Sequence, residues 1–256
     1  MSVNDPDNQD VAGRGWQHPV LAYLLQFLMT FLGVSLGFFA DNLREHWSER
    51  RTESEYLISL HADLIQDTAK LNFSIARKSD KLLRLDSLVR LLSGTDRQKH
   101  SGKIHFLLRY ASIREPFYAT TGTINQLESA GGLRIIQNRS LVAKLNEYQS
   151  ACAKVAEIQA IRDDQSTQLK SAIARIADGR VLMAIQDFSR NSQGQYWLDL
   201  PEGETTLLSE SPEEIRQLIY WLSNENSLEG ILQQLHRDLK ADASKLLAEL
   251  DHEMGD

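Results

Sequence analysis

The sequence predicts an all-α protein in which a single N-terminal transmembrane helix continues into a bundle of long helices, with one small hairpin or irregular insert. Residues 20–40 (VLAYLLQFLMTFLGVSLGFFA) contain no charged side chain. Neither glycine nor proline, the strongest helix punctuators, occurs within residues 38–93 or within residues 138–178. Leucine and isoleucine recur there at spacings of three and four, as the buried face of a helix requires.

Residues 20–40 are long enough to cross a bilayer as a helix, about 31 Å at roughly 1.5 Å per residue. A signal peptide typically has a shorter apolar region, about 7–15 residues, behind a basic segment. Here the acidic residues Asp5, Asp7 and Asp10 precede the apolar run within a polar tail, residues 1–19, that we expect to be disordered. The alternative is the core helix of a soluble protein, but such a helix rarely lacks a polar face over this length. We therefore interpret residues 20–40 as a membrane anchor.

The polar and small residues of this stretch share one helix face, because Gln26, Thr30, Gly33 and Gly37 follow one another at intervals of three or four. Gly33 and Gly37 form a GxxxG motif, which lets two membrane helices approach closely. Gln26 and Thr30 could then form hydrogen bonds between the helices. The alternative is a chance occurrence, since glycine is common in membrane helices. We expect this face to mediate homo-oligomerisation or to bind the helix of a partner membrane protein.

The basic residues near the anchor leave its orientation open. Only Arg14 precedes the anchor closely, whereas Arg44, Arg50 and Arg51 follow it. The positive-inside rule would therefore place the large C-terminal part in the cytoplasm, by a small margin.

Composition limits the classes of function. The chain of 256 residues has a formal net charge of -7 and a pI of about 5.5, which argues against a dedicated nucleic-acid binder. Its single cysteine, Cys152, excludes an intramolecular disulfide framework and a zinc site built from cysteines.

Residues 41–178 are expected to form a helical stalk and bundle. The first buried face has apolar residues interrupted by three polar ones, Asp67, Ser74 and Lys78; its apolar members are Leu57, Leu60, Leu64, Leu71, Ile75, Leu82, Leu85, Val89 and Leu92. A bend within residues 52–55 is an open alternative to one continuous helix. Shorter helices are expected at about residues 103–113 and up to residue 130, the second closed by Gly131.

Asn138 is the expected N-cap of a second long helix that reaches residues 178–179. Its inward face is expected to contain Leu141, Leu145, Tyr148, Cys152, Val155, Ile158 or Gln159, and Arg162. Helical periodicity then fails, and residues 179–210 are expected to be irregular or to pair residues 196–200 with 205–208 in a small hairpin. Residues 211–256 are expected to form C-terminal helices that pack on the bundle, with a start at Ser211 and a break before Ser227.

Two parts of the chain resemble a family of single-pass bacterial membrane proteins that is defined only as a domain of unknown function. The first part has the glycine-containing apolar span followed by Asp41-Asn42, Trp47 and a Tyr56-Leu57-x-x-Leu60-x-x-Asp63-Leu64 helix. The second is Thr121-x-Thr123-Ile-Asn-Gln-Leu127-Glu-Ser129-Ala-Gly131 and the segment up to Tyr148. The resemblance implies one N-terminal span and a helical soluble domain. We expect the protein to lie in the bacterial inner membrane. Members of the family usually have a basic N-terminal segment; this chain has an acidic one, so the side of the membrane remains open.

The sequence contains no phosphate-binding glycine loop, HExxH or GxSxG motif, and we expect no enzyme activity, cofactor or metal. The set His61, Asp63 and Asp67 is more typical of a solvated helix face than of a metal site. An anion could bind at the helix N-terminus near Thr121 and Thr123, between Arg114 and Arg134. A simple helix cap with surface arginines is the favoured alternative.

Charge is distributed unevenly along the chain. Residues 77–115 have ten Lys or Arg against four Asp or Glu, and residues 199–256 have four against fourteen. The simplest interpretation is that the acidic C-terminal segment packs against the basic one, although a basic patch could also bind anionic lipid. The sequence therefore predicts a membrane-anchored, homo-oligomeric interaction or scaffold protein. The alternatives are an accessory subunit of a larger membrane complex and a ligand-binding sensor with a site near residues 114–138.

Overall fold

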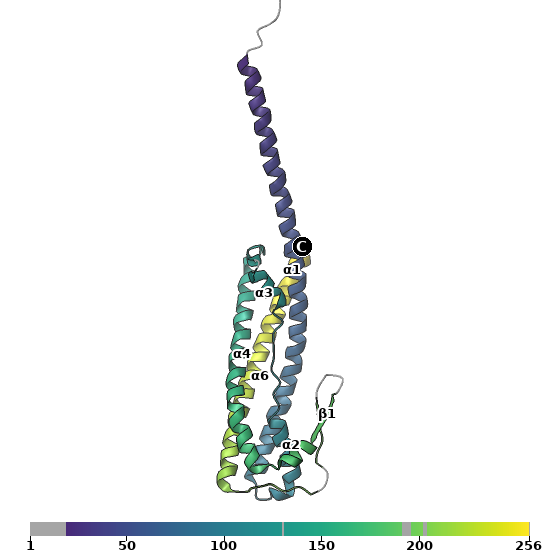
Figure 1. Ribbon diagram of the computed structural model, residues 1–256, viewed down its shortest axis with the longest axis vertical. Helices are drawn as coiled ribbons and strands as arrows, with labels where there is room; N and C mark the ends of the chain where they lie inside the picture. Colours follow the sequence, from purple (N-terminus) through teal and green to yellow (C-terminus); the bar gives the residue numbers. More distant parts are fainter. Residues whose placement is uncertain (1–18, 130, 191–195, 202–203, 256) are drawn as a thin grey trace, which may run out of the picture. The chain divides into compact units, whose positions relative to one another are not determined.

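The computed structural model describes residues 19–129, 131–190, 196–201 and 204–255, and it is all-α apart from one two-stranded hairpin (Figure 1). Residues 1–18 of the expected disordered tail lie outside the described residues, and Pro19 begins the first helix. By its internal contacts the chain divides into two compact units, Met1–Thr52 and Glu53–Asp256. Helix α1 (Pro19–Ser93) contributes its first part to one unit and its second part to the other, with no break at residues 52–55.

Within the described part of the second unit, three long helices run side by side: α1 from Glu53 onward, α4 (Arg139–Ile176) and α6 (Pro212–Gly255) (Figure 1). Side-chain contacts give their directions. His61 contacts Asp251 and Lys81 contacts Glu225, so α6 is antiparallel to α1. Lys144 and Arg175 contact Glu249 and Gln217, so α6 is also antiparallel to α4. Helices α1 and α4 therefore run in the same direction.

The parallel arrangement of α1 and α4 requires the chain to run back along α1, and residues 113–121, which we call the return segment, do so. After η1 (Gln98–His100) and α2 (Ser101–Ala111), residues 113–121 run in an extended conformation back along α1 to α3 (Gly122–Ser129) and η2 (Gly132–Arg134). An extended chain advances about 3.3 Å per residue against 1.5 Å in a helix, so a short segment covers several turns of α1. As expected, Gly131 adopts a left-handed conformation with a φ of 64° after α3. Asn138 caps α4, its side chain accepting a hydrogen bond from the Leu141 N–H at 3.1 Å.

The apolar core has two clusters. One lies around Leu60, Leu71, Leu145 and the C-terminal half of α6. The other lies around Leu88, α2, the end of α4 and the start of α6. The inward face predicted for α4 is buried at most of its positions, with Gln159 rather than Ile158 in the buried place.

The C-terminal third differs from the sequence prediction in three respects. Residues 179–184 form a short helix, α5 (Gly179–Ala184), whose N-cap is Asp178. The hairpin pairs β1 (Gln186–Arg190) with β2 (Tyr196–Leu198), instead of residues 196–200 with 205–208. Helix α6 is continuous through Ser227, where a break was expected, because the buried residues Leu222, Glu225, Glu229 and Leu232 keep one uninterrupted helical face.

Two leucines of α1 test which side of the helix stabilises the bundle. Leu88 is completely buried, whereas Leu83 is 70 % exposed. We expect Leu88→Ala to lower the free energy of unfolding by about 2–5 kcal/mol, because it removes buried apolar contacts and leaves a cavity. The matched variant Leu83→Ala should change it by less than about 0.5 kcal/mol. Urea denaturation of the detergent-solubilised protein measures both, and equal losses would contradict the assignment of the core face.

Candidate functional site

The exposed apolar part of α1 is the first candidate site, and it lies in the first unit. Residues Tyr23, Phe27, Met29 and Phe38 are at least 70 % exposed, and no residue of the most apolar window, with a mean hydropathy of 1.7, is buried. Water solvates such a surface poorly, and lipid solvates it well. By length and composition this part of the helix qualifies as a membrane span.

The four residues predicted to pack membrane helices lie on this exposed part. Gln26, Thr30, Gly33 and Gly37 are all exposed. The Thr30 hydroxyl donates to the Gln26 carbonyl at 2.9 Å, within its own helix. Apart from the neighbouring backbone of α1 itself, no atom of the described residues lies within 4 Å of the position that a Cβ would occupy at Gly33 or Gly37, so the face is open for another helix to approach closely.

A cluster of charged side chains lies inside the second unit, between the two apolar clusters. We call it the ionic cluster: Lys78, Lys81, Arg162, Glu225 and Glu229. Each of these five residues is at least nine-tenths buried. They come from α1, α4 and α6, so the cluster joins the three long helices.

Glu229 is the centre of the ionic cluster. Its carboxylate accepts hydrogen bonds from Lys78 Nζ at 2.6 Å, Lys81 Nζ at 2.9 Å and Arg162 Nη1 at 3.1 Å. Lys81 Nζ also donates to Glu225 at 2.6 Å and to the Ile113 carbonyl at 3.0 Å. Two of these residues belong to the basic segment and two to the acidic C-terminal segment, so the packing of those segments against each other is confirmed at these pairs.

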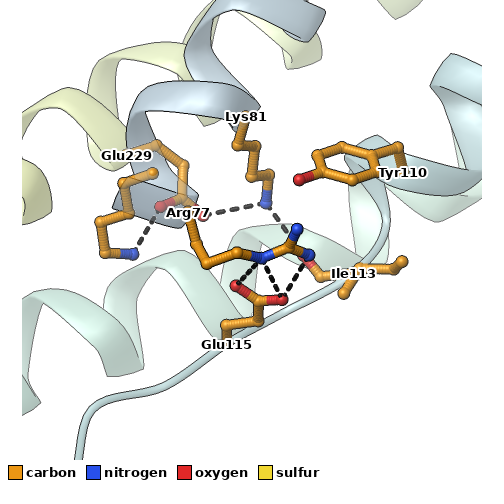
Figure 2. Close-up of a pocket in the computed structure, with 7 residues that line it drawn as sticks. Arg77, Lys81, Tyr110, Ile113, Glu115 and Glu229 are labelled. Carbon is orange, nitrogen blue, oxygen red and sulfur yellow. Dashed lines mark hydrogen bonds and ion pairs between the residues drawn. The ribbon is translucent and has the colours of Figure 1, made fainter. Parts of the chain in front are cut away.

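A small cavity of about 10 Å³, large enough for roughly one water molecule, adjoins the ionic cluster (Figure 2). Its wall includes Arg77, whose guanidinium makes a bidentate ion pair with Glu115 of the return segment at 2.7–3.1 Å. The Tyr110 hydroxyl nearby donates to Asp80 at 2.6 Å. This cavity is too small for an organic ligand.

The ionic cluster and its neighbour His236 have shifted pKa values. The three cations hold the pKa of Glu229 at about 2, against the cost of burial, which alone would raise it. Burial lowers the pKa of Lys78, although Glu229 opposes the shift. Burial also lowers the pKa of His236 to about 4, reinforced by the positive charge of Lys78. His236 lies against Ser74 of α1, with its Nδ1 at 3.0 Å from the hydroxyl, and against the Phe117 ring of the return segment.

Asp67 holds the return segment on α1. Its buried carboxylate accepts hydrogen bonds from the Thr120 N–H at 2.9 Å, the Thr120 hydroxyl at 2.6 Å and the Tyr148 hydroxyl at 2.9 Å. Lys70 Nζ donates to it at 3.2 Å. Burial raises the pKa of the Cys152 thiol, one turn after Tyr148, to about 11, so this thiol is unreactive at neutral pH.

The residues of the predicted anion site mostly have partners within the chain. The Thr123 N–H, at the start of α3, faces Asp63 at 3.3 Å, and Arg114 pairs with Asp163 at 3.2 Å. The Thr121 hydroxyl accepts from Asn125, and Arg134 is exposed on η2. Asp63 therefore occupies the position that an anion was expected to take. His61, Asp63 and Asp67 each contact a different part of the unit, and the described residues contain no group suited to a metal ion.

Two apolar grooves flank the return segment. One of about 440 Å³ lies between the segment and α1, and its lining includes Phe73, Phe117 and Tyr118. The other, of about 430 Å³, lies between the segment and α4, and its lining includes Thr121 and Cys152. Both have the volume of a small-molecule pocket, although they are open to solvent.

Comparison of the chain with protein-family models, with curated proteins and with solved structures gave no match. The sequence did not predict that the five residues of the ionic cluster come together. Its signal was present in Lys78 and Arg162, which occupy positions of otherwise apolar helix faces.

A substitution of Glu229 tests whether the ionic cluster holds the three long helices together. Replacing it by glutamine leaves three buried cations without their shared carboxylate, and we expect a loss of about 3–5 kcal/mol in the free energy of unfolding. The control Lys245→Met breaks the exposed pair of Lys245 with Asp242 and should cost less than about 1 kcal/mol. A loss below about 1 kcal/mol for Glu229→Gln in urea denaturation would contradict the description of the cluster.

His236 makes stability depend on pH. The unfolded chain binds a proton on this histidine below about pH 6.5, whereas the folded chain does so only below about pH 4. The contribution of His236 to the free energy of unfolding is therefore fully present above pH 6.5. It falls as the pH drops from 6.5 to 4, because the unfolded state binds the proton more readily than the folded state. We expect His236→Gln to reduce the difference between urea midpoints at pH 7 and pH 4.5. The exposed control His100→Gln should leave that difference unchanged; an unchanged difference in His236→Gln would refute the prediction.

Proposed function

We propose that this chain is a membrane-anchored helical interaction or scaffold protein, without enzyme activity, that assembles as a homo-oligomer. The observation that carries the proposal is the exposed apolar part of α1, which precedes a folded helical unit on the same chain. Together with the resemblance described above, it supports a single-pass protein of the bacterial inner membrane. The side of the membrane on which the second unit lies stays open.

The open face of Gly33 and Gly37 supports homo-oligomerisation. Lipid gives membrane helices no hydrophobic reason to associate, so association depends on close backbone approach and on hydrogen bonds between helices. Both glycines offer that approach, and the Gln26 side chain, exposed on the same face, supplies an amide. An accessory-subunit role would use the same face for the helix of a different protein.

A ligand-binding sensor is the second candidate function. The two apolar grooves beside Phe117 and Tyr118, each above 400 Å³, are the observation that favours it. A bound apolar ligand would contact the return segment, whose position depends on Asp67 and Thr120. A hydrophobic fluorescent probe whose emission shifts with wild-type protein but not with a Tyr118→Ala variant would support this candidate.

Membrane anchoring predicts how the protein fractionates. We expect the protein to remain with the membranes in high salt and at alkaline pH and to be released only by detergent. Replacing Leu28 and Leu32 by lysine should abolish this behaviour, because each charge within a span costs about 2.5–3.5 kcal/mol. The control changes Ile161 and Ile231, exposed residues of α4 and α6, to lysine and should still fractionate with membranes. Release of the wild-type protein by salt alone would overturn the proposal.

The face of α1 that contains Gly33 and Gly37, here called the glycine face, predicts how the oligomer responds to dilution. The wild-type protein in detergent should have a mass that is a multiple of 29.0 kDa. The Gly33→Ile/Gly37→Ile variant should dissociate at higher protein concentration, because its side chains hold the helices apart. A Val34→Ile/Leu36→Ile control places isoleucine on other faces of the same helix. Light scattering at several dilutions measures the dissociation of the three proteins. Identical dissociation of all three would show that the glycine face does not mediate oligomerisation.

A further inference from the structure

The charged residues of α1 between residues 58 and 76 all take part in contacts inside the second unit. His61 contacts α6 and Asp63 contacts α3. Asp67 contacts both the return segment and α4, and Lys70 contacts the return segment. The exposed residues of the same stretch are all uncharged: Ile58, Ser59, Ala62, Ile65, Gln66, Ala69, Asn72, Phe73 and Ala76. A solvated helix face usually has the opposite composition, with charges on the outside.

Helix α4 provides the comparison within the same unit. Its exposed positions include Lys154, Glu157 and Asp164, as expected for a face in contact with water. On α1, by contrast, Ile58 and Ile65 are 58 % and 51 % exposed. The outer face of α1 therefore has the composition of an interface.

Six of the exposed residues of α1 between residues 58 and 76 follow a heptad repeat, and we call them the outer seam: Ile58, Ala62, Ile65, Ala69, Asn72 and Ala76. Their spacing alternates between four and three, so isoleucine or asparagine occupies one core position of each heptad and alanine the other. The repeat spans about 27 Å of helix. Over residues 58–76 the flanking positions are Ser59, Gln66 and Phe73 on one side and His61, Thr68 and Ile75 on the other, so no lysine, arginine, aspartate or glutamate flanks the seam over this length. His61 contacts Asp251 of α6 within its own chain.

We propose that the outer seam binds the outer seam of a second copy of this chain, in parallel and in register. This inference rests on the proposed function, because anchors in one membrane tether both copies at the same end of residues 53–93. Such tethering raises the effective concentration of one seam for the other and favours the parallel arrangement. Alanine at one core position allows the two helices to approach closely, with a distance between their axes near the lower limit of the usual range of about 8–10 Å.

Asn72 specifies the register of the pair. In a parallel, in-register pair, Asn72 faces its own copy, and the two amides satisfy each other by hydrogen bonding. A shift of one heptad would place Asn72 against Ile65 and leave a buried amide without a partner. A single asparagine in a heptad core is an established determinant of register.

Cysteine cross-linking of the full-length protein in native membranes tests the arrangement. In a Cys152→Ala background, cysteine is introduced singly at Ile58, Ile65 and Ala76 on the seam, and at the exposed Ser171 of α4 and Ser244 of α6 as controls. Parallel, in-register pairing predicts disulfide-linked dimers at all three seam positions and none at the controls. Cross-linking at Ile65 alone would indicate an antiparallel pair, and cross-linking at the controls but not at the seam would indicate another interface; either result overturns the proposal.

Charge substitution separates this inference from the proposed function. The Ile58→Glu/Ile65→Glu variant should stay in the membrane fraction and keep its helical circular dichroism, and its seam cross-link at Ala76→Cys should fall at least tenfold. The matched Ile161→Glu/Ile231→Glu variant also replaces two exposed isoleucines and should retain the cross-link. A retained cross-link in the seam variant would refute the seam while leaving membrane anchoring intact. Loss of wild-type protein from the membrane fraction would instead refute the proposed function.

Discussion

The ion pairs of Glu229 are the interaction on which the arrangement of the helical unit depends. One carboxylate from α6 accepts hydrogen bonds from two lysines of α1 and from an arginine of α4. Burying these charges is costly, and each is tolerated only because its partners are in place. The cluster therefore does more to specify how the three helices align than to stabilise them: a slip of α6 along α1 by one turn would bring Glu225 or Gln233 to the position of Glu229, and the cluster would lose one of its two carboxylates.

The placement of charge inside the bundle has a consequence on its outside. Between residues 58 and 78, helix α1 directs its charged residues toward α4, α6 and the return segment, where Asp67 and Arg77 hold that segment by hydrogen bonds and an ion pair. The opposite face of α1 is left with isoleucine, alanine and asparagine at heptad spacing. The same helix also contains the exposed apolar part around the GxxxG motif. Both surfaces lack a partner of suitable chemistry within the described chain, and lipid and a second copy would supply one.

Much of the fold could be predicted from local sequence signals. The cap at Asn138, the left-handed turn at Gly131 and the buried leucines of α1 follow from rules that involve only neighbouring residues. Features that depend on tertiary contacts could not be predicted this way. The continuity of α6 through Ser227 depends on Glu225 and Glu229 having cationic partners on other helices. The pairing of β1 with β2 joins two short segments whose sequences show no clear periodicity. The anion predicted near Thr123 was inferred from an open helix N-terminus, whereas Asp63, distant in sequence, occupies that position.

A double-mutant cycle on Lys78 and Glu229 tests most directly whether the charges of α1 are neutralised inside the bundle. Each residue is replaced by methionine singly and then together, and unfolding free energies are measured in urea with the protein in detergent. We expect each single change to cost about 3–5 kcal/mol and the double change to cost at least about 2 kcal/mol less than the sum, because the second substitution removes a charge that the first left unpaired. Additive losses would contradict this expectation, since they would show that the two side chains do not interact across α1 and α6.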